Sequence, residues 1–178
     1  MSREINRACV AWSFAAMAAL ALSTACAREP GDAGTATTAS DPAVPGASAA
    51  TAPRMVVHKT PTCGCCGLWV EHIRQAGFRV EVRDTEDLHP VKVRLGVPYG
   101  KGSCHTAEVD GYLIEGHVPA DDIRRLLAQR PQARGLVLPG MPLGSPGMET
   151  PDGRVQPYTV ELVAKDGSTS AFGQHGSP

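Results

Sequence analysis

The alternation of apolar and polar residues predicts a β–α–β unit that begins near residue 55. Residues 55–58 form a short apolar run typical of a buried strand. Thr62 suits the N-cap of a helix, and Gly77 suits the residue that ends it. Apolar positions at helical spacing lie between them, namely Trp69, Ile73 and Ala76. Apolar and charged residues then alternate, as in a half-buried strand, with the apolar positions at Phe78, Val80 and Val82.

The rest of the pattern predicts two more helices and two hairpins. Residues 87–97 are expected to hold a short helix that Pro90 breaks early. Asp-Gly pairs between apolar runs, at residues 110–111 and 166–167, are typical of tight hairpin turns. Residues 119–131 begin and end with proline and enclose an amphipathic helix. The pattern therefore predicts an α/β domain with a small mixed sheet and flanking helices.

Residues 1–26 have the features of an export signal. Arg3 and Arg7 precede an apolar run over residues 8–22. That run is shorter than the ~20 residues of a membrane span, although a retained anchor helix is the alternative. Cys26 lies where a lipoprotein signal places its lipidated cysteine, and cleavage within Ala25-Cys26-Ala27 is the competing interpretation. The signal predicts export to the periplasm, with a lipid anchor at Cys26 favoured.

Residues 27–53 are expected to form a disordered linker. They consist almost entirely of Ala, Thr, Gly, Ser, Pro and Asp, which cannot bury enough apolar surface to offset the entropy of ordering. The remaining residues, 54–178, have a length that suits one domain.

The charge of residues 54–178 argues against a nucleic-acid partner. The segment contains 14 Lys and Arg and 14 Asp and Glu, so its net charge is zero with histidine neutral. Its longest basic run is Arg124-Arg125. Membrane contact is expected only through the N-terminal anchor.

Four cysteines carry the candidate chemistry of the domain. Three lie within Cys63-Gly64-Cys65-Cys66, and the fourth is Cys104. The positive end of a helix dipole lowers the pKa of thiols at its start, and thiolates are both nucleophiles and metal ligands. Cys63 and Cys66 have the C-x-x-C spacing of a redox dithiol, which makes a thiol–disulfide oxidoreductase one hypothesis. Cys65 is surplus to that chemistry.

A soft metal accounts for the surplus thiol better. Thiolates select Cu(I), zinc or iron–sulfur clusters. A closed zinc site usually takes its four ligands from two separated pairs, whereas thiolates that bridge several Cu(I) ions tolerate crowding. An iron–sulfur cluster is the weaker option in an exported protein. Two purely structural disulfides are disfavoured, because the loop between Cys63 and Cys66 is too short to stabilise much.

Further soft ligands lie within plausible reach of the thiols. His105 directly follows Cys104, and His58 ends the first predicted strand. Met141 and Met148 flank a Pro- and Gly-rich stretch. Each has an ordinary alternative, since a methionine is more often core filler and a histidine more often a surface residue. His117 precedes a helix and fits either role.

Four motifs in this order resemble the CopG-type copper-resistance proteins, a periplasmic, thioredoxin-like family. They are the run from Thr60 to Trp69 (TPTCGCCGLW), Gly102 to Thr106 (GSCHT), Glu115 to Pro119 (EGHVP) and Pro139 to Glu149. The resemblance covers nearly all of residues 55–172. It implies a thioredoxin-like fold, a role in copper tolerance, and copper ligation by Cys63, Cys65, Cys66 and Cys104.

One departure from ordinary thioredoxins bears on function. Those proteins place a cis-proline, followed by threonine, opposite the active-site sulfurs. Here Cys104-His105-Thr106 occupies the corresponding stretch, so a thiol and an imidazole would face the other three thiols. This makes general thiol–disulfide exchange less favoured.

The sequence therefore predicts a periplasmic protein of copper resistance and homeostasis. Cu(I) would be held in a multi-cysteine, polynuclear site, with interconversion of Cu(I) and Cu(II) as a further expectation. The alternative remains an oxidoreductase that uses Cys63 and Cys66. The expected partners are copper ions and other periplasmic copper-handling proteins.

Overall fold

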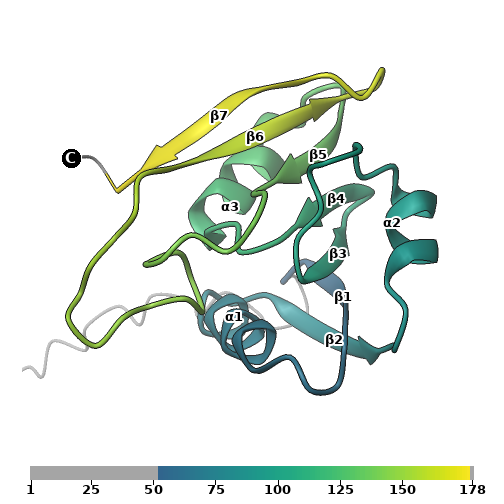
Figure 1. Cartoon of the computed structure of the whole chain (residues 1–178). Helices are drawn as coiled ribbons and strands as arrows, with labels where there is room; N and C mark the ends of the chain where they lie inside the picture. Colours follow the sequence, from purple (N-terminus) through teal and green to yellow (C-terminus); the bar gives the residue numbers. More distant parts are fainter. Residues whose placement is uncertain (1–51, 177–178) are drawn as a thin grey trace, which may run out of the picture. The chain divides into compact units, whose positions relative to one another are not determined.

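The computed structural model describes residues 52–176 of the chain (Figure 1). The predicted export signal, its Cys26 and nearly all of the predicted linker lie outside the described residues. Within residues 52–176 there is no helix with the length and apolar character needed to cross a membrane.

The described residues form one seven-stranded mixed sheet in the order β2-β1-β3-β4-β5-β6-β7. β2 runs parallel to β1, and β5 runs parallel to β4; the other neighbours are antiparallel. The strands are β1 (Arg54–Lys59), β2 (Arg79–Asp84), β3 (His105–Val109), β4 (Tyr112–Glu115), β5 (Ala133–Val137), β6 (Tyr158–Ala164) and β7 (Thr169–His175).

The predicted β–α–β unit is confirmed as β1, helix α1 (Gly64–Gln75) and β2. Trp69 and Ile73 point into the core from α1, as their spacing predicts. The expected N-cap at Thr62 is wrong by one residue, because Cys63 takes that position with extended backbone and makes no capping hydrogen bond through its side chain. The Cys63 sulfur is therefore not engaged in capping the helix.

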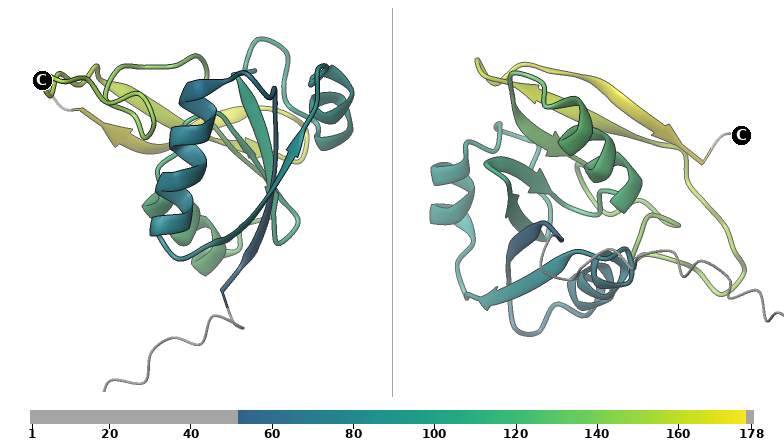
Figure 2. Two further views of the ribbon diagram at one scale, coloured as in Figure 1. Left: turned by 90° about the horizontal axis from the view of Figure 1, so that it is seen from below. Right: turned by 180° about the vertical axis from the view of Figure 1, so that it is seen from behind.

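Helices cover both faces of the sheet. α1 and α3 (Ala120–Gln129) lie on one face, and α2 (His89–Leu95) lies on the other (Figure 2). The larger core is built between the sheet and the α1–α3 layer, around fully buried residues such as Met55, Trp69 and Ile123. A smaller cluster lies beneath α2, where Leu95 packs against Leu113 and its neighbours.

The two predicted hairpins and the helix between prolines are confirmed. Asp110 and Gly111 both have positive φ, 53° and 83°, as the tight turn between β3 and β4 requires. The turn at residues 166–167 joins β6 to β7. Pro119 is the N-cap of α3, and Arg130 ends it with a left-handed backbone.

Two local features differ from the sequence prediction. Pro90 lies in the first turn of α2, where its missing N–H needs no partner, so it begins the helix rather than breaking it. β5 was not predicted. Its strand is short and contains Gly135, where a Cβ atom would lie 1.8 Å from the carbonyl oxygen of Leu113 in β4. The close approach of the two backbones therefore requires a glycine, and this glycine interrupts the apolar alternation by which a strand is identified.

The fold class is α/β and thioredoxin-like, as expected. The loop before α1, the loop before β3, the turn after β4 and the long segment after β5 are the parts that bring the candidate residues together.

Candidate metal centre

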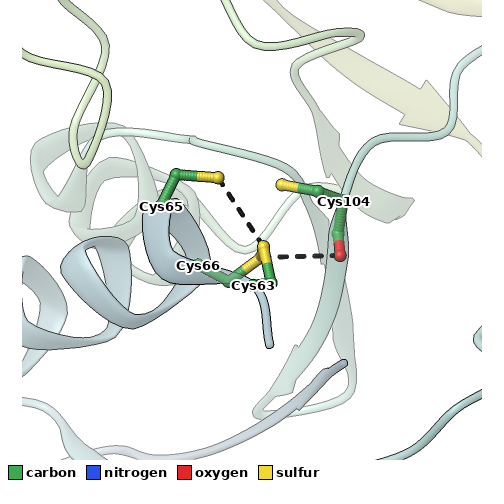
Figure 3. Close-up of side chains that lie close together, drawn as sticks. All are labelled: Cys63, Cys65, Cys66 and Cys104. Carbon is green, nitrogen blue, oxygen red and sulfur yellow. Dashed lines mark hydrogen bonds between the residues drawn. A yellow bond between two sulfur atoms is a disulfide. The ribbon is translucent and has the colours of Figure 1, made fainter. Parts of the chain in front are cut away.

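Four cysteine sulfurs converge at the start of α1. Cys63 precedes the helix, Cys65 and Cys66 lie in its first turn, and Cys104 immediately precedes β3 (Figure 3). Their Sγ atoms all lie within 4.8 Å of one another. The structure therefore brings together all four thiols that the sequence singled out.

Two of these sulfurs are bonded to each other. Cys63 and Cys66 form a disulfide, whereas Cys65 and Cys104 are free. The Cys65 Sγ lies 3.6 Å from the Cys63 Sγ, and Cys66 is fully buried. A two-electron reduction of this disulfide is needed before all four sulfurs can act as thiolates.

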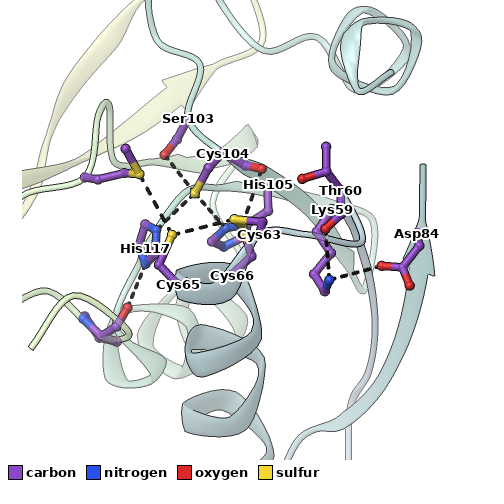
Figure 4. The surroundings of a disulfide bond; sticks show 12 residues. Lys59, Thr60, Cys63, Cys65, Cys66, Asp84, Ser103, Cys104, His105 and His117 are labelled. Atoms are coloured by element: carbon purple, nitrogen blue, oxygen red, sulfur yellow. Dashed lines mark hydrogen bonds and ion pairs between the residues drawn. A yellow bond between two sulfur atoms is a disulfide. The ribbon is translucent and has the colours of Figure 1, made fainter. Parts of the chain in front are cut away.

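A second group of possible ligands shares Cys104. Its Sγ lies 3.4 Å from Nδ1 of His105 and 3.1 Å from Nε2 of His117 (Figure 4). Both histidines are fully buried, and their rings meet edge to face at a centroid distance of 5.0 Å. Cys104 thus connects a sulfur group to a nitrogen group within one centre.

The carbonyl of Pro146 fixes the orientation of His117. Nδ1 of His117 lies 2.8 Å from that oxygen and must donate to it, because a carbonyl only accepts. Burial lowers the pKa of His117, so the ring is neutral at physiological pH and Nε2 keeps its lone pair. That lone pair faces Cys104. A histidine held by a backbone carbonyl in this way is typical of metal ligands.

His105 is a buried, neutral imidazole with spare hydrogen-bonding capacity. Its ring packs against Trp69 at a tilt of 40°, with 4.3 Å between centroids, and Trp69 is itself fixed by donating to the carbonyl of Val118. Burial, with a smaller effect from His117, lowers the pKa of His105 to about 3. Among residues 52–176 its Nε2 has no hydrogen-bond partner. The nitrogen that faces Cys104 is Nδ1, so Nδ1 is the His105 atom placed to act as a ligand.

The Cys104 thiol is held protonated in the absence of a cation. Burial, with a further contribution from Cys65, raises the pKa of Cys104 to about 11. A soft cation bound at this position would favour the thiolate form of Cys104. Without a cation, Cys104 is therefore a poor thiolate nucleophile at physiological pH.

The segment after β5 closes over the start of α1. Gly147 has φ +82°, and a Cβ atom there would lie 2.7 Å from both the Cys65 carbonyl oxygen and the Trp69 nitrogen. This contact places the preceding Pro146 against His117. Ser103 fixes the other end of the segment, because its hydroxyl donates to the carbonyl of Gly140 at 2.6 Å.

Two solved structures resemble this chain closely. They are named Copper resistance protein copG, form 1 and form 2. Each is 44% identical, with a TM-score of 0.66, over 70% of this chain and 98% of the other. This chain belongs to the CopG family. A family described as "Protein of unknown function, DUF411" also matches, over residues 101–148. No curated protein matches the chain.

The structure of this CopG-family chain brings together most of the predicted ligands, but not all. The Met141 sulfur lies 4.0 Å from the Cys65 sulfur. Met148, in contrast, makes no described hydrogen bond to the four sulfurs; its backbone N–H donates to Ser145, and its carbonyl accepts from Gly144. The predicted ligands that join the centre are Cys63, Cys65, Cys66, Cys104, His105 and Met141.

His58 lies on the opposite face of the sheet. It pairs with Thr106 across β1 and β3, and Thr106 faces α2. Nε2 of His58 lies 3.5 Å from Oε1 of Glu108 without forming a hydrogen bond. We therefore leave His58 out of the centre.

Sequence reasoning left the role of His117 open. Nothing in its spacing from the cysteines marks it as a ligand, because its contact with Cys104 depends on the turn after β4. The signal that could have selected it was its place in the third family motif.

Proposed function

We propose that this chain is an exported copper-resistance protein that holds Cu(I) in a polynuclear site. The proposed ligands are the four thiolates with two imidazoles, from Cys63, Cys65, Cys66, Cys104, His105 and His117. The observation that carries the proposal is the convergence of these donors in two overlapping groups that share Cys104.

The donor set favours copper over zinc. All its charged donors are thiolates, and soft thiolates suit Cu(I). Three of them come from four consecutive residues, which crowds the sulfurs instead of spreading them around one ion. A thiolate can bridge two Cu(I) ions, so crowding becomes an advantage when several ions share the site. The names of the related structures support copper as the metal handled.

The proposed site has two redox levels. Adding two electrons and two protons to the Cys63–Cys66 disulfide yields two thiols, and these lose their protons when Cu(I) binds. Within residues 52–176, the oxidised form keeps two free thiols, Cys65 and Cys104. Interconversion of Cu(I) and Cu(II) is part of the proposal: two Cu(I) ions that become two Cu(II) ions release the two electrons that the Cys63–Cys66 disulfide takes up. The same site offers sulfur ligands to Cu(I) and imidazoles to Cu(II).

Anaerobic titration with Cu(I) tests the proposal. The full chain, reduced with a phosphine, should bind more than one copper per chain in competition with a chromophoric chelator. The oxidised chain should bind one or fewer. Cys65→Ser should lower the copper bound by the reduced chain by at least one ion. One copper or fewer in the reduced chain, or an unchanged amount in Cys65→Ser, would contradict a polynuclear site.

A thiol–disulfide oxidoreductase is the second candidate, favoured by the disulfide itself. In that function the Cys63 sulfur is the accessible one, since Cys66 is fully buried. Insulin reduction that persists in Cys104→Ala, without copper binding, would support this function against ours.

Export and anchoring at Cys26 complete the proposal. The periplasm suits a copper-resistance protein, and its other copper-handling proteins would be the partners. Metabolic labelling with a radioactive fatty acid should mark the full chain and leave Cys26→Ala unlabelled. Labelling of both or neither would argue against a lipid at this cysteine.

A further inference from the structure

We propose that Met141 is the ligand through which copper enters and leaves this centre, and that Ser103 positions it. The proposal rests on the proposed copper function and adds a route to it. Met141 would take part in transfer of the ion, while the thiolates and imidazoles hold the ion at rest.

Met141 lies at the boundary between the centre and solvent. Its side chain is 50% exposed, whereas Cys66, His105 and His117 are fully buried. Its sulfur lies 4.0 Å from the sulfur of Cys65, which is partly exposed. An ion that first contacts the thioether is thus within one ligand exchange of the thiolates.

The chemistry of a thioether suits transfer better than storage. It is soft enough to bind Cu(I) but neutral, so it binds the ion more weakly than a thiolate does. A site of passage must be attractive enough to be entered and weak enough to be left. Because the methionine side chain is flexible and unbranched, its sulfur can move with the ion along part of the route between solvent and the thiolates.

Ser103 connects this exposed sulfur to the buried centre. Its hydroxyl donates to the carbonyl of Gly140, the residue before Met141, and Ser103 itself directly precedes Cys104 in the sequence. The backbone N–H of Ser103 in turn donates to the buried carboxylate of Glu115. The loop that carries Met141 is therefore fastened to the loop that carries Cys104, and Ser103 is a positioning residue.

Copper exchange kinetics test the proposal with the full, reduced chain under argon. Transfer of Cu(I) from the protein to a chromophoric chelator, and from the chelator complex back to the protein, are followed by stopped flow. Met141→Leu should slow both directions about tenfold, which is about 1.4 kcal/mol in the barrier. Affinity is the ratio of the two rates, and it should change far less than either. Ser103→Ala should slow both directions less, and Ser103→Thr, which keeps the hydroxyl, should restore the rates.

Met148→Leu is the matched control, since it removes a second thioether of the same segment for which no hydrogen bond to the sulfurs is described. It should exchange copper at the rate of the unaltered chain. If Met141→Leu speeds release and leaves loading unchanged, Met141 is an ordinary resting ligand and the proposal is wrong. Unchanged rates in both directions would also overturn it. The copper bound at saturation reports separately on the polynuclear site, so failure of that function and failure of this route are distinguishable.

Discussion

The buried polar groups on the two faces of β3 differ in whether their hydrogen bonds are satisfied. His105 and Thr106 are neighbours in sequence and point to opposite sides of the sheet. On the α2 face, the Glu115 carboxylate accepts hydrogen bonds from Lys92, Thr106 and the backbone of Ser103. On the α1 face, His105 keeps a buried nitrogen that lacks a partner among residues 52–176.

This difference distinguishes a polar group with a structural role from one that is suited to binding a ligand. A buried polar cluster that satisfies itself stabilises the fold and needs nothing further. A cluster of neutral soft donors with unused lone pairs gains its missing interactions from a ligand. Burial raises the pKa of Glu115, and the ammonium of Lys92 opposes that shift. The charge of the carboxylate is therefore compensated by a cation of the protein itself. Among residues 52–176, no described hydrogen bond or ion pair joins a lysine or an arginine to the free cysteine thiols or to His105 and His117.

The largest expected effect is on the α2 face. Glu115→Ala should lower the free energy of unfolding by about 3 kcal/mol, because it leaves the Lys92 ammonium and the Ser103 N–H without their buried partner. Urea unfolding of the reduced, metal-free chain measures this. Glu86→Ala, at an exposed glutamate, should change it by less than about 0.5 kcal/mol. If both substitutions had the same effect, the carboxylate would not be structural.

The next effect concerns pH on the α1 face. The pKa of His105 is lowered to about 3 in the folded chain, against an ordinary value of 6.5. The unfolded chain therefore takes up a proton first as pH falls below about 6.5, and stability is lost from there down towards pH 3. Between pH 7 and pH 5 the metal-free chain should lose about 2 kcal/mol through this residue.

His105→Leu isolates that contribution. Leucine fills the site without a titrating nitrogen, so the variant should lose about 2 kcal/mol less over the same pH interval. Urea unfolding at pH 7, 6 and 5 gives both slopes. At pH 7 the variant should be as stable as the unaltered chain, because the substitution also removes an unpartnered nitrogen. Equal slopes would show that His105 is not the group that titrates.

The smallest effect is on copper affinity. His117→Ala should weaken Cu(I) binding about tenfold, or about 1.4 kcal/mol, since it removes one neutral nitrogen and leaves the four thiolates. Competition with a chelator of known affinity measures the change. His89→Ala, at an exposed histidine on α2, is the control and should bind as the unaltered chain does. Equal affinities for both variants would remove His117 from the ligand set.

Local patterns predicted the parts of the fold that short segments determine. The β1–α1–β2 unit, both Asp-Gly hairpins and α3 follow from periodicity and turn residues close together in the sequence. β5 did not follow, because Gly135 is required by the backbone of β4 and leaves no apolar alternation. A proline within a helical pattern predicts a break, whereas Pro90 lies in the first turn of α2, where the helix needs no N–H from it.

In the candidate site too, the residues that could be predicted are those identified by short sequence segments. The cysteine pattern located the centre, and His105 could be predicted as a ligand because it directly follows Cys104 in the sequence. His58 could have been set aside by strand alternation alone, since it is out of phase with the buried Met55 and Val57. His117 was beyond reach, because its orientation depends on the carbonyl of Pro146, 29 residues further along the chain.

Gly147 gives this centre an evolutionary constraint. Any side chain there would collide with the backbone of α1 and move the carbonyl that orients His117. Natural variation at position 147 should therefore be tied to position 117: sequences that keep the histidine should keep the glycine, and the two should be lost together. Laboratory evolution under copper selection, with both codons randomised, would reveal that linkage as paired survival.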